Sequence, residues 1–154
     1  MTNKRKILFI TERRADYSRL KPIMKAVRQS EKLRLQLLVT GMHLLKSFGE
    51  TINVIKNDGF KIDAILPTFS ENDEDTGASM VAAMGKALTG MSEIFNKLKP
   101  DIIFSGFDIG ANFAAAITGM HMNIRVCHIQ GGEVSGTIDE VIRHGITKFA
   151  HIHF

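Results

Sequence analysis

The chain has 154 residues, of which 44% are hydrophobic and 23% charged, values that predict one compact globular domain and exclude disordered or fibrous proteins. The net charge is +4, but the lysines and arginines are scattered rather than gathered in a basic stripe, so nucleic acid is not an expected partner. No apolar run approaches the roughly 20 residues that span a membrane, and the single cysteine, Cys127, excludes internal disulfides, so we expect a cytoplasmic protein without a membrane partner.

Short apolar runs alternate along the chain with longer helical patterns. This alternation predicts an α/β fold in which helices cover both faces of a doubly wound parallel sheet. The expected strands are Lys6–Thr11, Leu33–Thr40, Lys61–Leu66, Asp101–Ser105, Ile124–Ile129 and, at the end of the sequence, Ala150–Phe154. The expected helices are Tyr17–Gln29, Leu44–Asp58, Ala78–Lys97, Gly110–Met120 and Ile138–Phe149.

Two of these helices carry signals of their own. Thr137 and Glu140 have the spacing of a capping box, which predicts that the last helix begins at this threonine and that both side chains bond free backbone amides. In the helix Ala78–Lys97, apolar residues recur at alternating spacings of three and four. This stripe comprises Val81, Met84, Leu88, Met91, Phe95 and Leu98. We interpret it as a core-facing surface, with a helix–helix dimer contact as the alternative.

The loop after the first strand is the first place where chemistry is expected, because ligands of open parallel sheets bind beyond the carboxyl ends of the strands. It contains Arg14 and Asp16 and lacks the glycine-rich fingerprint of dinucleotide sites. Asp16 is interpreted either as the N-cap of the next helix or as a site residue. Arg14 has no comparable structural role and is suited to pair with a phosphate or carboxylate.

Two further loops place single polar residues at the same edge of the sheet. His43 follows the second strand and Asp108 follows the fourth. Taken singly, His43 is explained as a surface imidazole and Asp108 as the N-cap of the next helix. Their convergence on one edge instead predicts a shared site, in which a carboxylate among apolar neighbours serves as an acid or base.

The loop after the fifth strand combines glycines with charged residues. Gly131 and Gly132 let the backbone approach a ligand closely, and the next helix directs its positive end toward the same edge. Glu140 is better explained by the capping box than by function. Arg143 and His144 lie one turn into the helix, where a solvated surface is the alternative interpretation.

Together, these motifs resemble those of the hydrolysing UDP-N-acetylglucosamine 2-epimerases of the sialic-acid and legionaminic-acid pathways. The resemblance rests on segments 14–24, 41–44 and, above all, 122–148, and it covers nearly the whole chain. Members of that family are much longer. The resemblance therefore implies that residues 1–154 form one Rossmann-like domain, the first half of a two-domain fold of the glycosyltransferase-B type, with the second domain absent.

The family's reaction eliminates UDP across C1 and C2 of the sugar and adds water to the enzyme-bound glycal, which releases N-acetylmannosamine. The resemblance implies a UDP-sugar substrate, a homodimer formed through helices of this domain, and no nicotinamide or metal cofactor. His151 and His153 also lack a third ligand at suitable spacing, so no metal site is expected. Because the second domain carries most of the UDP contacts in this family, the isolated chain is expected to be inactive.

The family also implies roles for individual residues. Substrate contacts are implied for Arg14, Asp16, His43, Arg143 and His144. Catalytic positions are implied for Asp108, Gln130, Glu133 and Asp139.

Two positions depart from the family pattern. The family's fourth-strand motif, Gly-Asp-Arg, here reads Gly106-Phe107-Asp108, which displaces Asp108 by one residue. The family's catalytic glutamate corresponds to Gln130, whose amide cannot transfer a proton. Three explanations stay open: Glu133 takes the role, the chain acts on a variant substrate such as UDP-N,N'-diacetylbacillosamine, or it is a non-catalytic module that binds a nucleotide sugar.

Overall fold

The computed structural model of the chain describes residues 4–154, in which six parallel strands form one sheet in the order β3-β2-β1-β4-β5-β6. The strands are β1 (Arg5–Thr11), β2 (Leu33–Thr40), β3 (Ala64–Leu66), β4 (Ile102–Gly106), β5 (Arg125–Ile129) and β6 (Ile152–His153). The helices are α1 (Arg14–Gln29), α2 (Ile52–Asn57), α3 (Gly77–Leu98), α4 (Gly110–His121) and α5 (Ile138–Phe149). The winding direction reverses between β1 and β4, and such a switch point is where open α/β sheets bind ligands.

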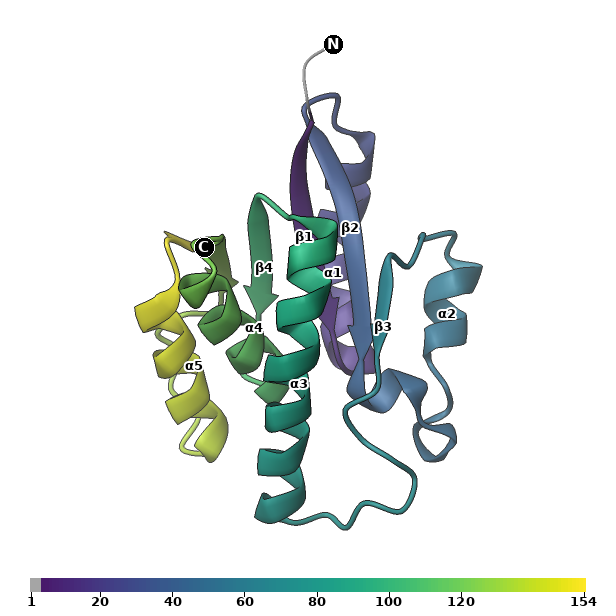
Figure 1. Cartoon of the computed structure of the whole chain (residues 1–154), viewed down its shortest axis with the longest axis vertical. Coiled ribbons are helices and arrows are strands. Elements are labelled where there is room, and N and C mark those ends of the chain that lie inside the picture. Colours follow the sequence, from purple (N-terminus) through teal and green to yellow (C-terminus); the bar gives the residue numbers. More distant parts are fainter. Residues whose placement is uncertain (1–3) are drawn as a thin grey trace.

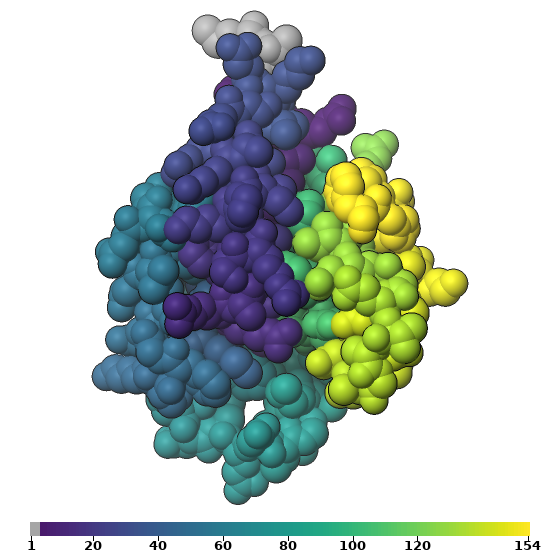
Figure 2. Space-filling model, turned by 180° about the vertical axis from the view of Figure 1, so that it is seen from behind, coloured from purple at the N-terminus to yellow at the C-terminus, as the bar shows by residue number. Residues whose placement is uncertain are grey.

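Helices cover both faces of the sheet (Figure 1), so the expected doubly wound α/β architecture is confirmed. On one face, α1 and α2 pack against strand side chains such as Phe9 and Leu37. On the other face, α3 and α4 pack against Leu8 and Ile10. Because successive side chains of a strand point to opposite faces, β1 contributes to both halves of the core. Seen from the first of these faces, α1 lies between the region of α2 and the C-terminal elements (Figure 2).

The segment after β2 differs from the expected helix Leu44–Asp58. It consists of two 3-10 turns, Gly41–Leu44 and Lys46–Phe48, followed by the short helix α2. Gly49 and Glu50 adopt left-handed backbone angles, with φ of 80° and 43°, and these angles interrupt a continuous helix.

The strand expected at Lys61–Leu66 is also shorter, and β3 contains only its last three residues. At its beginning, a side chain takes the place of the backbone ladder. The Asp63 carboxylate accepts the backbone N–H of Leu37 at 3.1 Å, while the Asp63 backbone N–H donates to the Leu37 carbonyl at 2.9 Å. The polar side chain thus ends the regular pairing that the hydrophobic pattern alone predicted.

The apolar stripe of α3 divides into two parts. Met91 and Phe95 are buried, and Leu88 and Leu98 pack against the same core cluster, as expected. Val81, nearer the start of the helix, is 64% exposed because this end of α3 extends past the sheet. The stripe is therefore core-facing in its second half only.

Cys127 lies on β5 and is buried, and this burial raises the pKa of its thiol to about 11. Within residues 4–154, no helix combines the length and apolar character needed to cross a membrane.

Candidate functional site

A cavity of about 440 Å³ lies at the carboxyl edge of the sheet, beside the switch point between β1 and β4. Its charged lining comes from Glu12, Arg13, Asp108 and Asp139. Its apolar wall includes Met80, Val81, Met84, Phe113, Ile138 and Ile142, from the N-terminal halves of α3, α4 and α5. Of the nine residues that the sequence singled out, this cavity brings together Asp108 and Asp139.

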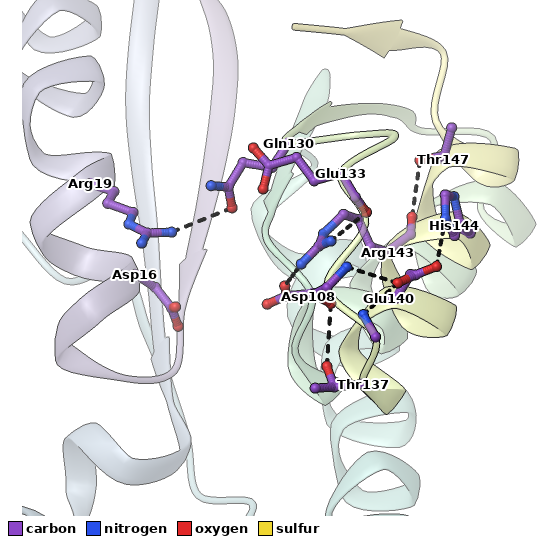
Figure 3. Close-up of polar contacts among 12 residues, drawn as sticks. Asp16, Arg19, Asp108, Gln130, Glu133, Thr137, Glu140, Arg143, His144 and Thr147 are labelled. Atoms are coloured by element: carbon purple, nitrogen blue, oxygen red, sulfur yellow. Dashed lines mark hydrogen bonds and ion pairs between the residues drawn. The ribbon is translucent and has the colours of Figure 1, made fainter.

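Arg143 is the centre of a charged cluster at the edge of this cavity (Figure 3). Its guanidinium is almost fully buried, pairs with the Asp108 carboxylate and donates to the Glu133 carbonyl oxygen at 2.6 Å. Arg13 approaches the same carboxylate from the β1 loop, with 3.4 Å between its Nη2 and Asp108 Oδ1. Two guanidinium groups therefore fix the position of Asp108, although neither arginine had been assigned that task from the sequence.

The residue inserted before Asp108 has a conformation that few side chains tolerate. Phe107 is buried and has a φ of 95°, far into the left-handed region. The Arg19 guanidinium lies 5.6 Å from the centre of its ring. The strained turn absorbs the extra residue while Asp108 still reaches the cavity.

The first turn of α1 holds Asp16 and Arg14 in different environments. The N-cap of α1 is Arg13, so the interpretation of Asp16 as the N-cap is wrong. Asp16 is instead the third helical residue, and its carboxylate accepts the Arg13 backbone N–H at 3.2 Å and the Arg13 Nε at 3.1 Å. Burial raises the pKa of Asp16 above its ordinary value. The Arg14 side chain is exposed and forms no ion pair with residues 4–154, which leaves it open to an anionic ligand.

His43 is fully buried, which the interpretation as a surface imidazole did not foresee. Its ring lies between two hydroxyl groups, with Nε2 2.8 Å from Thr11 Oγ1 and Nδ1 2.6 Å from Thr51 Oγ1. Burial lowers the pKa of the imidazole to about 4. A neutral ring that bonds both threonines joins the end of β1 to the N-cap of α2, and a substrate contact by His43 stays a prediction.

Gln130 and Glu133 leave β5 on a loop that does not line the cavity. Gln130 has a φ of 64°, and its amide oxygen accepts a long hydrogen bond of 3.5 Å from Arg19 of α1 (Figure 3). The Glu133 side chain is exposed, and only the backbone carbonyl of this residue touches the charged cluster.

Helix α5 begins where the sequence predicted, but the side chains at its start make other hydrogen bonds than expected. Thr137 is the N-cap, as expected, but its side chain makes no capping bond, so the expected capping box is wrong. Glu140 instead accepts the backbone N–H groups of Ser135 at 2.8 Å and Gly136 at 2.7 Å. These amides lower the pKa of Glu140. The carboxylate thus orders the preceding glycine-rich loop rather than the helix end.

Two other residues of α5 differ in their surroundings. Asp139 is partly buried and lines the cavity, as a catalytic carboxylate would. His144 is exposed, and its Nε2 lies 3.8 Å from Glu140 Oε1. Of the predicted basic pair, only Arg143 belongs to the cluster at the cavity.

Sequence reasoning missed the most buried carboxyl of the cavity lining. Glu12 follows β1 directly, is 7% exposed and accepts the backbone N–H of Ala111 at 3.2 Å. Burial raises its pKa to about 7, although the Ala111 amide opposes this effect. Its position immediately after an apolar strand was the available signal.

No group of three or more His, Cys, Asp or Glu side chains among the described residues is arranged to hold a metal ion.

Comparison with known proteins relates the chain to one enzyme family. A family model described as UDP-N-acetylglucosamine 2-epimerase matches residues 25–154. A UDP-N,N'-diacetylbacillosamine 2-epimerase (hydrolyzing) from Legionella pneumophila subsp. pneumophila is 44% identical over 150 residues, which are 97% of this chain and 39% of the relative.

Solved structures confirm the fold. A UDP-GlcNAc 2-epimerase from Neisseria meningitidis, bound to UDP-GlcNAc, has a TM-score of 0.82 at 18% identity, covering 97% of this chain and 39% of that one. The glycosyltransferase SnogD from Streptomyces nogalater has a TM-score of 0.61 at 14% identity, covering 95% of this chain and 40% of that one. These likenesses agree with a Rossmann-like domain of the glycosyltransferase-B type. The chain spans about two fifths of the length of each protein.

Proposed function

Because the chain belongs to the UDP-N-acetylglucosamine 2-epimerase family, we propose that it supplies the first domain of a hydrolysing UDP-sugar 2-epimerase. The observation that carries this proposal is the Asp108 carboxylate, held between Arg13 and Arg143 at a cavity beside the switch point. A structural ion pair needs no such cavity, whereas a carboxylate that acts on a sugar needs both a fixed position and access.

The reaction requires removal of the poorly acidic C2 proton and departure of UDP from C1. Positioned acids and bases accelerate such proton transfers by about 10² to 10⁴. Asp108 lines the cavity from the loop after β4 and Asp139 from the first turn of α5, and the exposed guanidinium of Arg14 is suited to meet a phosphate oxygen. The remaining UDP contacts belong to a second domain, so the 154-residue chain by itself is expected to release no UDP.

The apolar wall of the cavity favours a second candidate substrate, UDP-N,N'-diacetylbacillosamine. This 6-deoxy sugar presents a methyl group and a second acetamido group where N-acetylglucosamine presents hydroxyl groups. Val81, Phe113 and Ile142 offer the methyl groups an apolar surface, whereas a hydroxyl group buried there would lack a partner. The 44% identical relative carries this substrate in its name.

Product analysis tests both candidates in the full-length protein. In D₂O, the expected products are free UDP and a 2-epimeric free sugar with deuterium at C2, detected by proton NMR. The preference for the 6-deoxy sugar in kcat/KM is expected to be about 10-fold or more, the discrimination typical of one methyl group in an apolar pocket. Equal or reversed preference would contradict the second candidate, and no UDP release from either sugar would contradict the proposed function.

A further inference from the structure

Glu12 occupies a position built around its carboxyl group. One carboxylate oxygen accepts the Ala111 N–H in the first turn of α4, and the Glu12 backbone carbonyl accepts the His43 N–H at 3.1 Å. The residue thus joins the end of β1 to the loop after β2 and to α4. The residue is only 7% exposed, and it lines the cavity.

Gly41 makes room for this carboxyl. Its φ is +58°, and a Cβ atom at this position would overlap Glu12 Cγ. The side chain cannot move away freely, because its carboxylate is bonded to the start of α4. The glycine therefore permits the backbone of the β2 loop to lie directly against Glu12.

The other carboxyl groups are less suited to transfer a proton. Gln130 carries an amide, and Glu133 is exposed and lies outside the lining of the cavity. Asp108 is committed to two guanidinium groups. Among the carboxyl groups of the lining, Glu12 alone is both almost fully buried and without a direct cationic partner.

We propose that Glu12 is the proton-transfer residue of this cavity and takes the role that a glutamate at position 130 would have. This inference rests on the proposed function. In the elimination, the Glu12 carboxylate accepts the C2 proton, the C2–H electrons form the C1=C2 bond, and UDP leaves C1 with the electrons of the C1–O bond. In the hydration, the water oxygen bonds to C1 and the water loses a proton to solvent, while C2 takes a solvent-derived proton on the opposite face of the ring, which inverts this carbon, and Glu12 releases its proton to solvent.

The ionisation of Glu12 is consistent with accepting the C2 proton and then releasing it to solvent. Burial raises its pKa to about 7, which keeps both protonation states populated near neutral pH. Asp16 and Arg13 face it with opposite effects, raising and lowering the pKa respectively. A group with this pKa accepts a proton and releases it most efficiently close to neutrality.

The test is the exchange of the C2 proton with D₂O in the full-length protein. Glu12→Gln keeps an oxygen for the Ala111 amide and removes the titratable group, so exchange and UDP release are expected to fall by about 10² to 10⁴. UDP-sugar binding, measured by calorimetry, is expected to change little. Glu93→Gln, an exposed substitution on α3, is the matched control and is expected to retain wild-type exchange.

Competing outcomes separate this inference from the proposed function. An active wild type with a Glu12→Gln variant that keeps exchange overturns the role of Glu12 alone, and loss of exchange in Glu133→Gln instead assigns the role to that residue. An inactive wild type overturns both proposals. If Glu12→Gln does not fold, the wild-type pH profile decides: kcat/KM that follows the Glu12 carboxyl resonance in ¹³C NMR supports the inference, and a profile flat between about pH 6 and 8 overturns it.

Discussion

The loops at the carboxyl ends of β1 and β4 differ sharply from the loop between β5 and α5. In the first region, Glu12 accepts the Ala111 backbone N–H, and Asp108 pairs with both Arg13 and Arg143. In the second, Glu133 is exposed, although this loop carries the densest family motif. The family motif therefore does not mark the site uniformly: Asp139 and Arg143 of its helical part belong to the site, whereas Gln130 and Glu133 of its loop lie outside the cavity lining.

Removal of Asp108 is expected to have the largest effect on this comparison. Asp108→Ala leaves the buried Arg143 guanidinium without its carboxylate, a change that typically destabilises a protein by about 3 to 5 kcal/mol. Glu133→Ala, in the second region, is expected to change stability by less than about 0.5 kcal/mol. Urea unfolding of both variants measures the difference, and equal effects would show that the two regions are alike.

The pH dependence of stability tests the burial of Glu12. Its pKa rises from 4.5 to about 7 on folding, so its contribution is most favourable below pH 4.5 and is lost as the pH rises through 7. The loss is about 3 kcal/mol, and Glu12→Gln is expected to remove it and to be the more stable protein above pH 7. His43, whose pKa falls from 6.5 to about 4, destabilises the fold as the pH falls over that interval.

Thermal or urea unfolding of the variant and the wild type at each pH gives the difference between them. The contribution of His43 is common to both proteins and cancels. A difference that does not vary between about pH 4 and 8 would mean that Glu12 titrates as a solvated carboxyl.

A matched pair of glycines compares the packing of the two regions. Gly41 and Gly132 both have positive φ, of 58° and 85°, so alanine strains the backbone at either position by roughly 1 to 2 kcal/mol. At Gly41 the new methyl group also overlaps Glu12, which adds about 1 to 3 kcal/mol, while at Gly132 it meets no atom within 4 Å. Differential scanning calorimetry should therefore rank Gly41→Ala as the less stable variant, and the reverse order would place Glu12 elsewhere.

The smallest expected effect distinguishes the two adjacent arginines. Arg13→Ala loses the ion pairs with Asp16 and Asp108. Because the Arg13 side chain is partly exposed, this loss is expected to lower stability by about 1 kcal/mol. Arg14→Ala is expected to leave stability unchanged and to weaken UDP-sugar binding in the full-length protein. Calorimetric titration and urea unfolding together check this division, which fails if Arg14→Ala binds like the wild type.

The sequence predicted the fold well because strand segments buried on both faces appear as apolar runs, such as residues 7–10 of β1 and 37–39 of β2. It also predicted a site at the carboxyl edge of the sheet, because the loops that follow parallel strands meet there. It could not predict which of Arg13 and Arg14 faces inward, because the two are adjacent at the start of α1 and the choice depends on Asp108, 95 residues away from Arg13. The burial of His43 likewise depends on Thr11, from another strand.

The buried thiol of Cys127 on β5 is an intrinsic probe of local unfolding. Only the thiolate reacts rapidly with alkylating reagents. In the folded protein this reaction is slow for two reasons: Cys127 is buried, and burial raises the pKa of its thiol to about 11. Because the sequence has no other cysteine, every alkylated molecule reports one opening of the structure around β5. The rate of mass gain with iodoacetamide therefore reports how often this strand becomes accessible, in crude extracts as well as with purified protein.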